Sequence, residues 1–201
     1  MPTRKDIIMS KNNLKNKPFF ILCIVIIIVI FAITSINKLD TNLSKTSLIE
    51  KYKLNNLSTE EIVETLDRNN EDYQGLSASI TSEKLKLSDG KTNIELNIPK
   101  DKFYLSFAPY INNTHPCKKH NLISCRSELV NEKFFLKIVD NFGNKLIEKE
   151  VYSMANGFIG IWLPKNFEGV MEVHYNGLVA STKIDTFRGS NTCLTTPLKL
   201  R

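Results

Sequence analysis

Histidine and cysteine are scarce in this chain of 201 residues, which contains three and four of them respectively. Residues 37–201 also lack an internal repeat and a low-complexity tract, so the sequence does not indicate a repeat architecture there. The formal net charge of +6 is uneven: residues 1–18 contribute +4, and the 165 residues after position 36 carry 22 basic against 20 acidic side chains. Because nucleic-acid binding requires clustered basic residues, we expect no nucleic-acid partner.

Charged residues are absent from positions 19–36, where Phe19 to Ile33 forms an unbroken apolar run. The length suits a transmembrane helix over 19–36, and the basic residues before it predict a cytoplasmic tail at 1–18. Residues 37–201 would then be extracytoplasmic, with the chain in the cell membrane. No A-x-A-like site follows the run, which disfavours the alternative of a cleaved signal peptide and secretion. Cys23 lies within the run after Leu22, an unsuitable context for lipidation.

Proline and glycine are missing from residues 37–56, which we interpret as a stalk. A capping box at Ser58 and Glu61 then predicts a short helix. From residue 76 apolar side chains alternate with polar ones, and turn signals such as Asp89-Gly90 and Asn176-Gly177 separate the segments. This pattern predicts a mainly β (α+β) fold: an antiparallel β-sandwich-like domain after a short helical segment and the N-terminal transmembrane helix.

The scarce residues are concentrated in one segment. His115, Cys117, His120 and Cys125 follow the spacing H-x-C-x2-H-x4-C, and Cys193 lies near the C-terminus. Thiolate sulfur and imidazole nitrogen are ligands for soft and borderline transition metals. The cluster therefore predicts a metal site, although three simpler interpretations compete with it.

The first alternative is a disulfide between Cys117 and Cys125, since exported cysteines are usually oxidised. The second is a structural zinc centre, for which two cysteines and two histidines would suffice. The third is that His115 and His120 are ordinary loop residues. A disulfide within the segment would leave Cys193 as an odd thiol that needs its own explanation.

Copper accounts for the number of thiols. Cu(I) prefers two or three thiolates, and three cysteines follow the apolar run. Thiols also reduce Cu(II) while forming a disulfide, so Cys117 and Cys125 could alternate between a dithiol that holds Cu(I) and a disulfide. The neighbouring Lys118 and Lys119 would lower thiol pKa values weakly. We interpret His174, on an expected strand, as an ordinary histidine.

Three stretches, taken together, resemble the CueP family of exported copper-binding proteins associated with copper resistance. They are Cys117-x2-His120-x4-Cys125 preceded by the strand from Tyr104 to Tyr110, the segment from Asn156 to Pro164, and Thr192 to Thr196. The resemblance covers residues 57–201, with a smaller part at 57–100 and a β-rich part with the cysteines at 101–201. We expect the segment from Asn156 to be core and corner structure, with Gly157 and Gly160 allowing close backbone approach.

The resemblance implies that Cys117, Cys125 and Cys193 bind the metal, with His115 or His120 in an auxiliary role. It implies a non-enzymatic protein that sequesters Cu(I), with stoichiometric Cu(II) reduction, and a copper acceptor or thiol reductase as partner. Zinc is the less favoured metal. Two other functions stay open on the residues alone: a thiol–disulfide redox protein, against which the absence of C-x-x-C argues, and a structural β-domain with a Cys117–Cys125 disulfide.

Overall fold

Residues 17–201 are described by the computed structural model, except for the side chains of 17–20, 37–43, 70 and 71. The predicted cytoplasmic tail over 1–18 thus lies outside the described side chains. The chain divides into two units at Ser47/Leu48, and helix α2 (Lys17–Lys51) runs through this boundary. Among the described residues, no helix has the length and hydropathy needed to cross a membrane. The transmembrane helix expected over 19–36 is therefore not supported.

The second unit begins earlier than residue 57. Leu48 and Leu54, in the segment interpreted as a stalk, are buried in a hydrophobic core with residues of the following helix. That helix, α3 (Thr59–Arg68), starts at the predicted capping box: the Ser58 hydroxyl accepts from the Glu61 backbone, and the Glu61 side chain accepts from the Ser58 backbone. A short 3₁₀ turn, η1 (Asn70–Tyr73), follows it.

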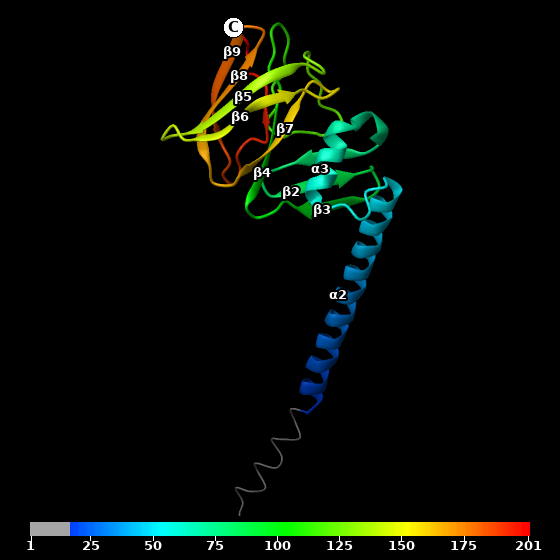
Figure 1. Cartoon of the computed structure of the whole chain (residues 1–201). Coiled ribbons are helices and arrows are strands. Elements are labelled where there is room, and N and C mark those ends of the chain that lie inside the picture. The colour runs from blue at the N-terminus through cyan, green and yellow to red at the C-terminus, as the bar shows by residue number, and fades with distance from the viewer. Residues whose placement is uncertain (1–16) are drawn as a thin grey trace, which may run out of the picture. The chain divides into compact units, whose positions relative to one another are not determined.

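In the part of the chain that the structure describes, ten strands form three sheets, one more than a two-sheet sandwich has (Figure 1). The first sheet has the order β1-β2-β3, the second β10-β4-β7 and the third β6-β5-β8-β9. Their bounds are β1 (Ser77–Ile80), β2 (Lys84–Ser88), β3 (Asn93–Asn97), β4 (Lys102–Phe107), β5 (Lys133–Asp140), β6 (Lys145–Tyr152), β7 (Ile159–Pro164), β8 (Glu168–Tyr175), β9 (Leu178–Asp185) and β10 (Cys193–Leu194). The strands on either side of the two turn signals, β2 with β3 and β8 with β9, form antiparallel pairs as predicted. The pairs β1 with β2 and β5 with β6 are antiparallel too.

The second sheet is buried on both faces, because β4 contributes side chains to two separate cores. Phe103, Leu105 and Phe107 pack with residues of the third sheet, which gives the predicted sandwich. Tyr104, on the opposite face of β4, packs with α3 and the first sheet. β10 joins β4 in parallel, in the register Cys193 to Ser106, a pairing that the antiparallel prediction did not include.

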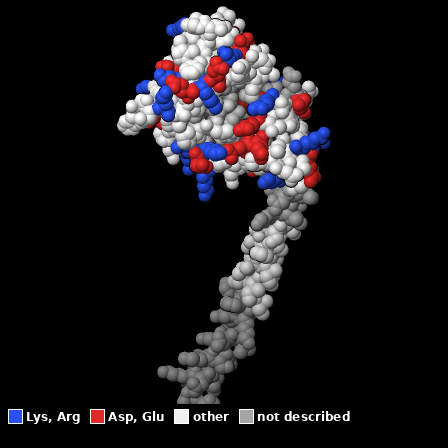
Figure 2. Space-filling model, in the orientation of Figure 1, with Lys and Arg blue, Asp and Glu red and all other residues white. Residues whose placement is uncertain are grey.

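Charged side chains are interspersed on the face drawn in Figure 2, where Lys and Arg lie among Asp and Glu. The domain also has ion pairs across neighbouring strands, such as Lys86 with Glu95 at 2.9 Å and Lys133 with Glu150 at 3.0 Å. Such exposed pairs contribute little to stability. The polar surface of this domain is therefore of the ordinary solvated kind expected from the sequence.

Candidate metal site

The segment that carries Cys117 and Cys125 is an irregular connection between β4 and β5. Its two ends are tied together by Glu128, whose carboxylate accepts hydrogen bonds from the backbone N–H groups of Ile111, Asn112 and Asn113. Burial would raise the pKa of Glu128, but these backbone hydrogen bonds stabilise the carboxylate and lower it. The residues before His115 therefore have a fixed position.

The middle of the segment is attached to the first sheet. The Ile80 N–H donates to the His120 carbonyl at 2.9 Å, and the Leu122 N–H donates to the Ala78 carbonyl at 2.7 Å. Asn121 then turns the chain, because its side-chain oxygen accepts from the backbone of the residues two and three positions later. This turn directs Cys125 back toward Cys117.

The third cysteine is positioned by the C-terminal strand. Cys193 opens β10 and is fully buried. The preceding Thr192 has four hydrogen-bond partners. Its N–H donates to the Lys118 carbonyl, and its carbonyl accepts from the Ser106 N–H of β4. Its hydroxyl donates to the Ile80 carbonyl and accepts from the His120 N–H. The Thr192 hydroxyl is buried and both donates and accepts a hydrogen bond, so it holds Cys193 close to the segment between β4 and β5.

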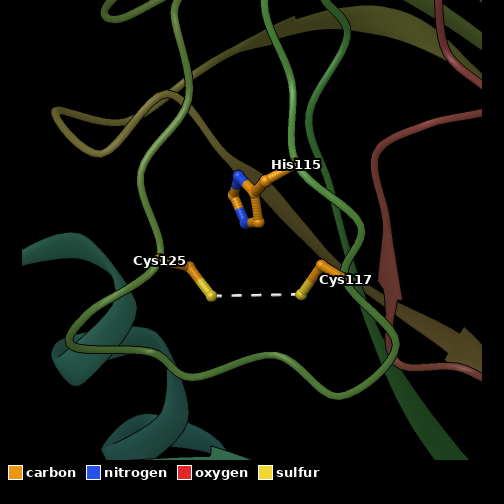
Figure 3. A group of neighbouring side chains, drawn as sticks. All are labelled: His115, Cys117 and Cys125. Carbon is orange, nitrogen blue, oxygen red and sulfur yellow. Dashed lines mark hydrogen bonds between the residues drawn. The ribbon is translucent and has the colours of Figure 1, made fainter.

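The three sulfur atoms meet in a small apolar cluster made by Ala108, Phe158 and Cys193, with Cys117 and Cys125 packed against it. Cys117 and Cys193 form a disulfide with a Cα–Cα distance of 5.5 Å. Cys125 is free, and its Sγ lies 4.0 Å from the Cys117 Sγ (Figure 3). The structure thus has, in place of the alternative Cys117–Cys125 disulfide, one between cysteines 76 positions apart. The reason is the parallel β10–β4 pairing, which brings in Cys193.

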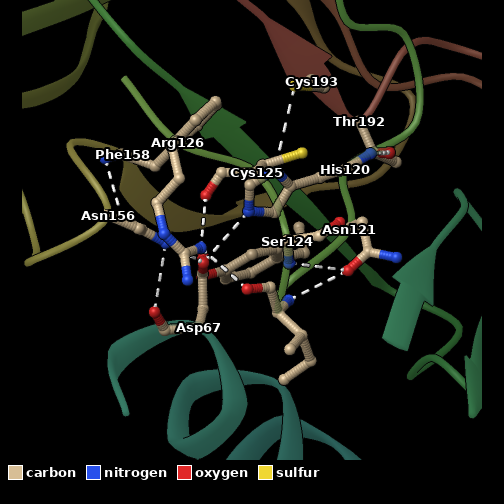
Figure 4. A network of polar contacts seen from close by, with 12 residues as sticks. Asp67, His120, Asn121, Ser124, Cys125, Arg126, Asn156, Phe158, Thr192 and Cys193 are labelled. Atoms are coloured by element: carbon tan, nitrogen blue, oxygen red, sulfur yellow. Dashed lines mark hydrogen bonds and ion pairs between the residues drawn. The ribbon is translucent and has the colours of Figure 1, made fainter. Parts of the chain in front are cut away.

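His120 is also part of this cluster. Its side chain is fully buried, and its ring packs on Phe158 with 4.6 Å between centroids. Nε2 lies 3.0 Å from the Asp67 Oδ1, and Nδ1 lies 3.8 Å from the Cys193 Sγ (Figure 4). Since a carboxylate only accepts, Nε2–H donates to Asp67 and Nδ1 faces the sulfur.

Asp67 is the functional candidate that the sequence did not reveal. It is a fully buried carboxylate on the last turn of α3. Besides His120, it accepts the Tyr104 hydroxyl at 2.7 Å and the Asn156 side-chain amide at 3.0 Å. Gly160 leaves room for this arrangement, since a Cβ there would lie 1.7 Å from the Tyr104 hydroxyl oxygen.

The segment from Asn156 therefore has a second role beside the core and corner structure expected for it. Asn156 also accepts the Phe158 N–H at 2.8 Å, which fixes the ring that covers His120. Gly157 has a φ of +81°, and a Cβ there would come within 2.6 Å of the Ser127 carbonyl oxygen. The predicted close backbone approach is confirmed at this glycine.

Protonation at the site follows these contacts. Burial alone would lower the pKa of His120, but hydrogen bonds to Asp67 and Cys125 outweigh it and raise the pKa to about 9. Burial would likewise raise the pKa of Cys125, whereas the His120 imidazolium and the Asn121 backbone bring it below the usual thiol value. Cys125 is thus the more reactive kind of thiol.

Two groups of donors within the described residues could hold a metal ion. One comprises His115, Cys117 and Cys125, and the other Cys117, His120 and Cys193; within each, the donor atoms lie within 4.8 Å of one another. All five residues named from the sequence are therefore brought together. His174 is not, because it lies on β8 beside Glu172.

A β-sandwich domain with three convergent cysteine sulfurs and two imidazoles belongs to the class of soft-metal-binding proteins, since these donors suit copper better than hard cations. The family model described as periplasmic copper-binding protein CueP matches residues 61–199. The chain belongs to the CueP family, as the resemblance indicated. The first unit falls outside the matched residues.

The crystal structure of S.CueP is similar to this chain, with 46% sequence identity and a TM-score of 0.75. The match covers 78% of this chain and 97% of that one. A search of curated proteins returned no match. The family model and the solved structure thus agree on the family and fold of this chain.

Proposed function

We propose that this protein is an extracytoplasmic copper carrier that sequesters Cu(I) through Cys117, Cys125 and Cys193. The observation that carries the proposal is the convergence of three sulfurs from two distant segments into one apolar cluster. Copper is cargo here, so the site must exist with and without it. Membership of a family described as periplasmic and copper-binding supports both the metal and the location.

The donor set favours copper over zinc. Cu(I) accepts two or three thiolates in a low-coordinate arrangement, which a cluster with three sulfurs can provide. A structural zinc site would need a closed tetrahedron of Cys and His. Because the two imidazoles belong to different donor groups, neither group alone offers four donors. Zinc is therefore the weaker candidate.

Reduction of Cu(II) is the second part of the proposal. Oxidation of the Cys117 and Cys193 thiols to their disulfide releases two electrons and two protons, so two Cu(II) ions become two Cu(I) ions. The disulfide in the structure would be the product of that step. A thiol reductant is then needed to restore the dithiol, which makes a thiol reductase an expected partner. Each reduced chain would reduce two Cu(II) ions, so we expect a stoichiometric reaction rather than enzymatic turnover by the protein alone.

The test uses the purified full-length chain, reduced and handled without oxygen. In competition with bicinchoninate it should bind about one Cu(I) per chain and prefer Cu(I) to Zn(II). Cys23→Ser is the matched control, because Cys23 lies in α2 outside the cluster. A triple variant of Cys117, Cys125 and Cys193 to Ser that bound Cu(I) as tightly would disprove the proposal. Titrated Cu(II) should lose its paramagnetic resonance signal as thiols disappear.

Thiol–disulfide exchange is a second candidate, supported by one specific observation. Cys125 is free with a lowered pKa, and its sulfur lies 4.0 Å from a disulfide sulfur, which suits attack on that bond. Insulin reduction by the chain in the absence of copper would favour this function. Cu(I) binding without such activity would favour copper sequestration.

A further inference from the structure

The two donor groups of the site overlap at a single atom, the Cys117 Sγ. The outer group adds His115 and Cys125 to it, and the inner group adds His120 and Cys193. Cys117 can contact both thiols, since it is bonded to Cys193 and its sulfur lies 4.0 Å from that of Cys125. The three cysteines are therefore not equivalent, because only Cys117 takes part in both groups.

The two groups differ in their access to solvent. All three residues of the outer group are partly exposed, whereas His120 and Cys193 are fully buried. His115 also lines a surface hollow of about 290 Å³ with Asn113, Thr114, Arg126, Ser127 and Glu128. In Figure 3 its imidazole lies above the gap between the Cys117 and Cys125 sulfurs. An ion from solvent would thus meet the outer group first.

The inner group is held more rigidly. Asp67 binds the Nε2 of His120, and this contact leaves Nδ1 directed at the Cys193 sulfur. A metal-binding histidine commonly donates its other N–H to a carboxylate, which fixes the ring and strengthens the ligand. Asp67 is itself held by Tyr104 and Asn156, as Figure 4 shows for Asn156. His115 has no carboxylate partner among the described contacts.

We infer that Cu(I) passes through two positions, entering at His115, Cys117 and Cys125 and coming to rest at Cys117, Cys193 and His120. This division of roles rests on the proposed function. Throughout the transfer the bond to the Cys117 sulfur is kept. Bonds to the His115 nitrogen and the Cys125 sulfur break, and bonds to the Cys193 sulfur and the His120 Nδ1 form. The proton displaced from the Cys193 thiol passes to the released Cys125 thiolate. The Nδ1 proton of the charged His120 passes to solvent, and no electron is transferred.

Asp67 is then a positioning residue for the inner histidine, and the two histidines have different effects. His115 affects how fast Cu(I) enters, whereas His120 and Asp67 affect how tightly it is held. A site with three equivalent thiols and no histidine ligand would show neither difference.

The experiment measures Cu(I) binding to the reduced full-length chain in two ways. X-ray absorption at the copper edge detects scattering from a bound imidazole, and stopped-flow transfer from Cu(I)–bicinchoninate gives the uptake rate and the affinity. The variants are His115→Asn, His120→Asn and Asp67→Asn. His174→Asn is the matched control, since His174 lies on β8 outside both groups.

Imidazole scattering should persist in wild type, His115→Asn and His174→Asn and be lost in His120→Asn. His115→Asn should slow uptake about tenfold and leave affinity unchanged, and Asp67→Asn should weaken affinity about tenfold or more and leave the uptake rate unchanged. If His120→Asn fails to fold, the opposite effects of His115→Asn and Asp67→Asn on uptake rate and affinity still test the inference. Persistent imidazole scattering in His120→Asn, or equal effects of His115→Asn and Asp67→Asn, would overturn the inference while Cu(I) binding stands. A wild type that bound no Cu(I) would instead refute the proposed function.

Discussion

The substitution Gly160→Ala should destabilise the domain although it adds only a methyl group. Gly160 lies on β7 opposite Ser106 of β4, and its φ is not in the left-handed region. Backbone strain therefore does not contribute, and the effect is purely steric. The added Cβ would lie 1.7 Å from the Tyr104 hydroxyl oxygen and 2.5 Å from its ring carbon. Either the Tyr104 ring or the β7 backbone must move.

The magnitude follows from the contacts that this movement breaks. Ordinary contact requires about 3.4 Å or more, so the Tyr104 hydroxyl loses its 2.7 Å hydrogen bond to Asp67. A lost hydrogen bond to a buried charged group costs about 1.5–3 kcal/mol, and overpacking of a core adds about 1–3 kcal/mol. The expected loss is about 2.5–6 kcal/mol, a large fraction of the stability of a typical domain.

Urea unfolding of the disulfide-bonded chain, followed by circular dichroism, measures this loss. Tyr104→Phe provides the control, because it removes the hydroxyl that the Cβ would meet. Gly160→Ala should cost less in the Tyr104→Phe background than in wild type, with a coupling of roughly 1 kcal/mol or more. Equal costs in both backgrounds, or a cost below about 1 kcal/mol in wild type, would refute the steric argument.

Three further outcomes are expected. The pKa of His120 in the folded state is raised to about 9, so its charged form contributes its full stabilisation below pH 6.5. This contribution is lost as the pH rises toward 9, which urea unfolding across this range measures. The loss of stability should be smaller in Asp67→Asn. Reduction of the disulfide, which closes a loop of 76 residues, should lower the free energy of unfolding by about 4 kcal/mol, and Cys125→Ser should not. Peptide mapping of the oxidised chain should find Cys117 linked to Cys193, and in Cys193→Ser linked to Cys125; a Cys117–Cys125 link in wild type would contradict the structure.

Local features of the fold could be predicted because their causes lie within a few residues. The capping box at Ser58 and Glu61 closes over one helical turn, and the strand pairs follow from alternation and turn residues. The short β10 could not be predicted in this way. A strand of two residues is too short to show a hydrophobic periodicity. Cys193 pairs with β4 because the preceding Thr192 binds the loop that carries Cys117 and the first sheet.

The same distinction applies to the site. The thiols and histidines could be named because their chemistry is rare and concentrated. Asp67 could not, because a polar residue at the end of an amphipathic helix usually faces solvent. Its partners Tyr104, His120 and Asn156 lie 37, 53 and 89 positions away. The alternative of a Cys117–Cys125 disulfide joined the nearest cysteines in the sequence, whereas the structure joins Cys117 of the loop to Cys193 at the start of β10.

The segments that carry the three cysteines are held by hydrogen bonds that do not depend on the disulfide. Each cysteine follows an anchor of its own: residues 111–113, bound by the Glu128 carboxylate, precede Cys117. The Asn121 turn precedes Cys125, and the Thr192 hydrogen bonds precede Cys193. None of these anchors uses a sulfur atom. Opening the Cys117–Cys193 bond therefore removes a cross-link without removing the contacts that keep the sulfurs together. A frame of this kind can present either a disulfide or three thiols, as repeated uptake and release of copper would require.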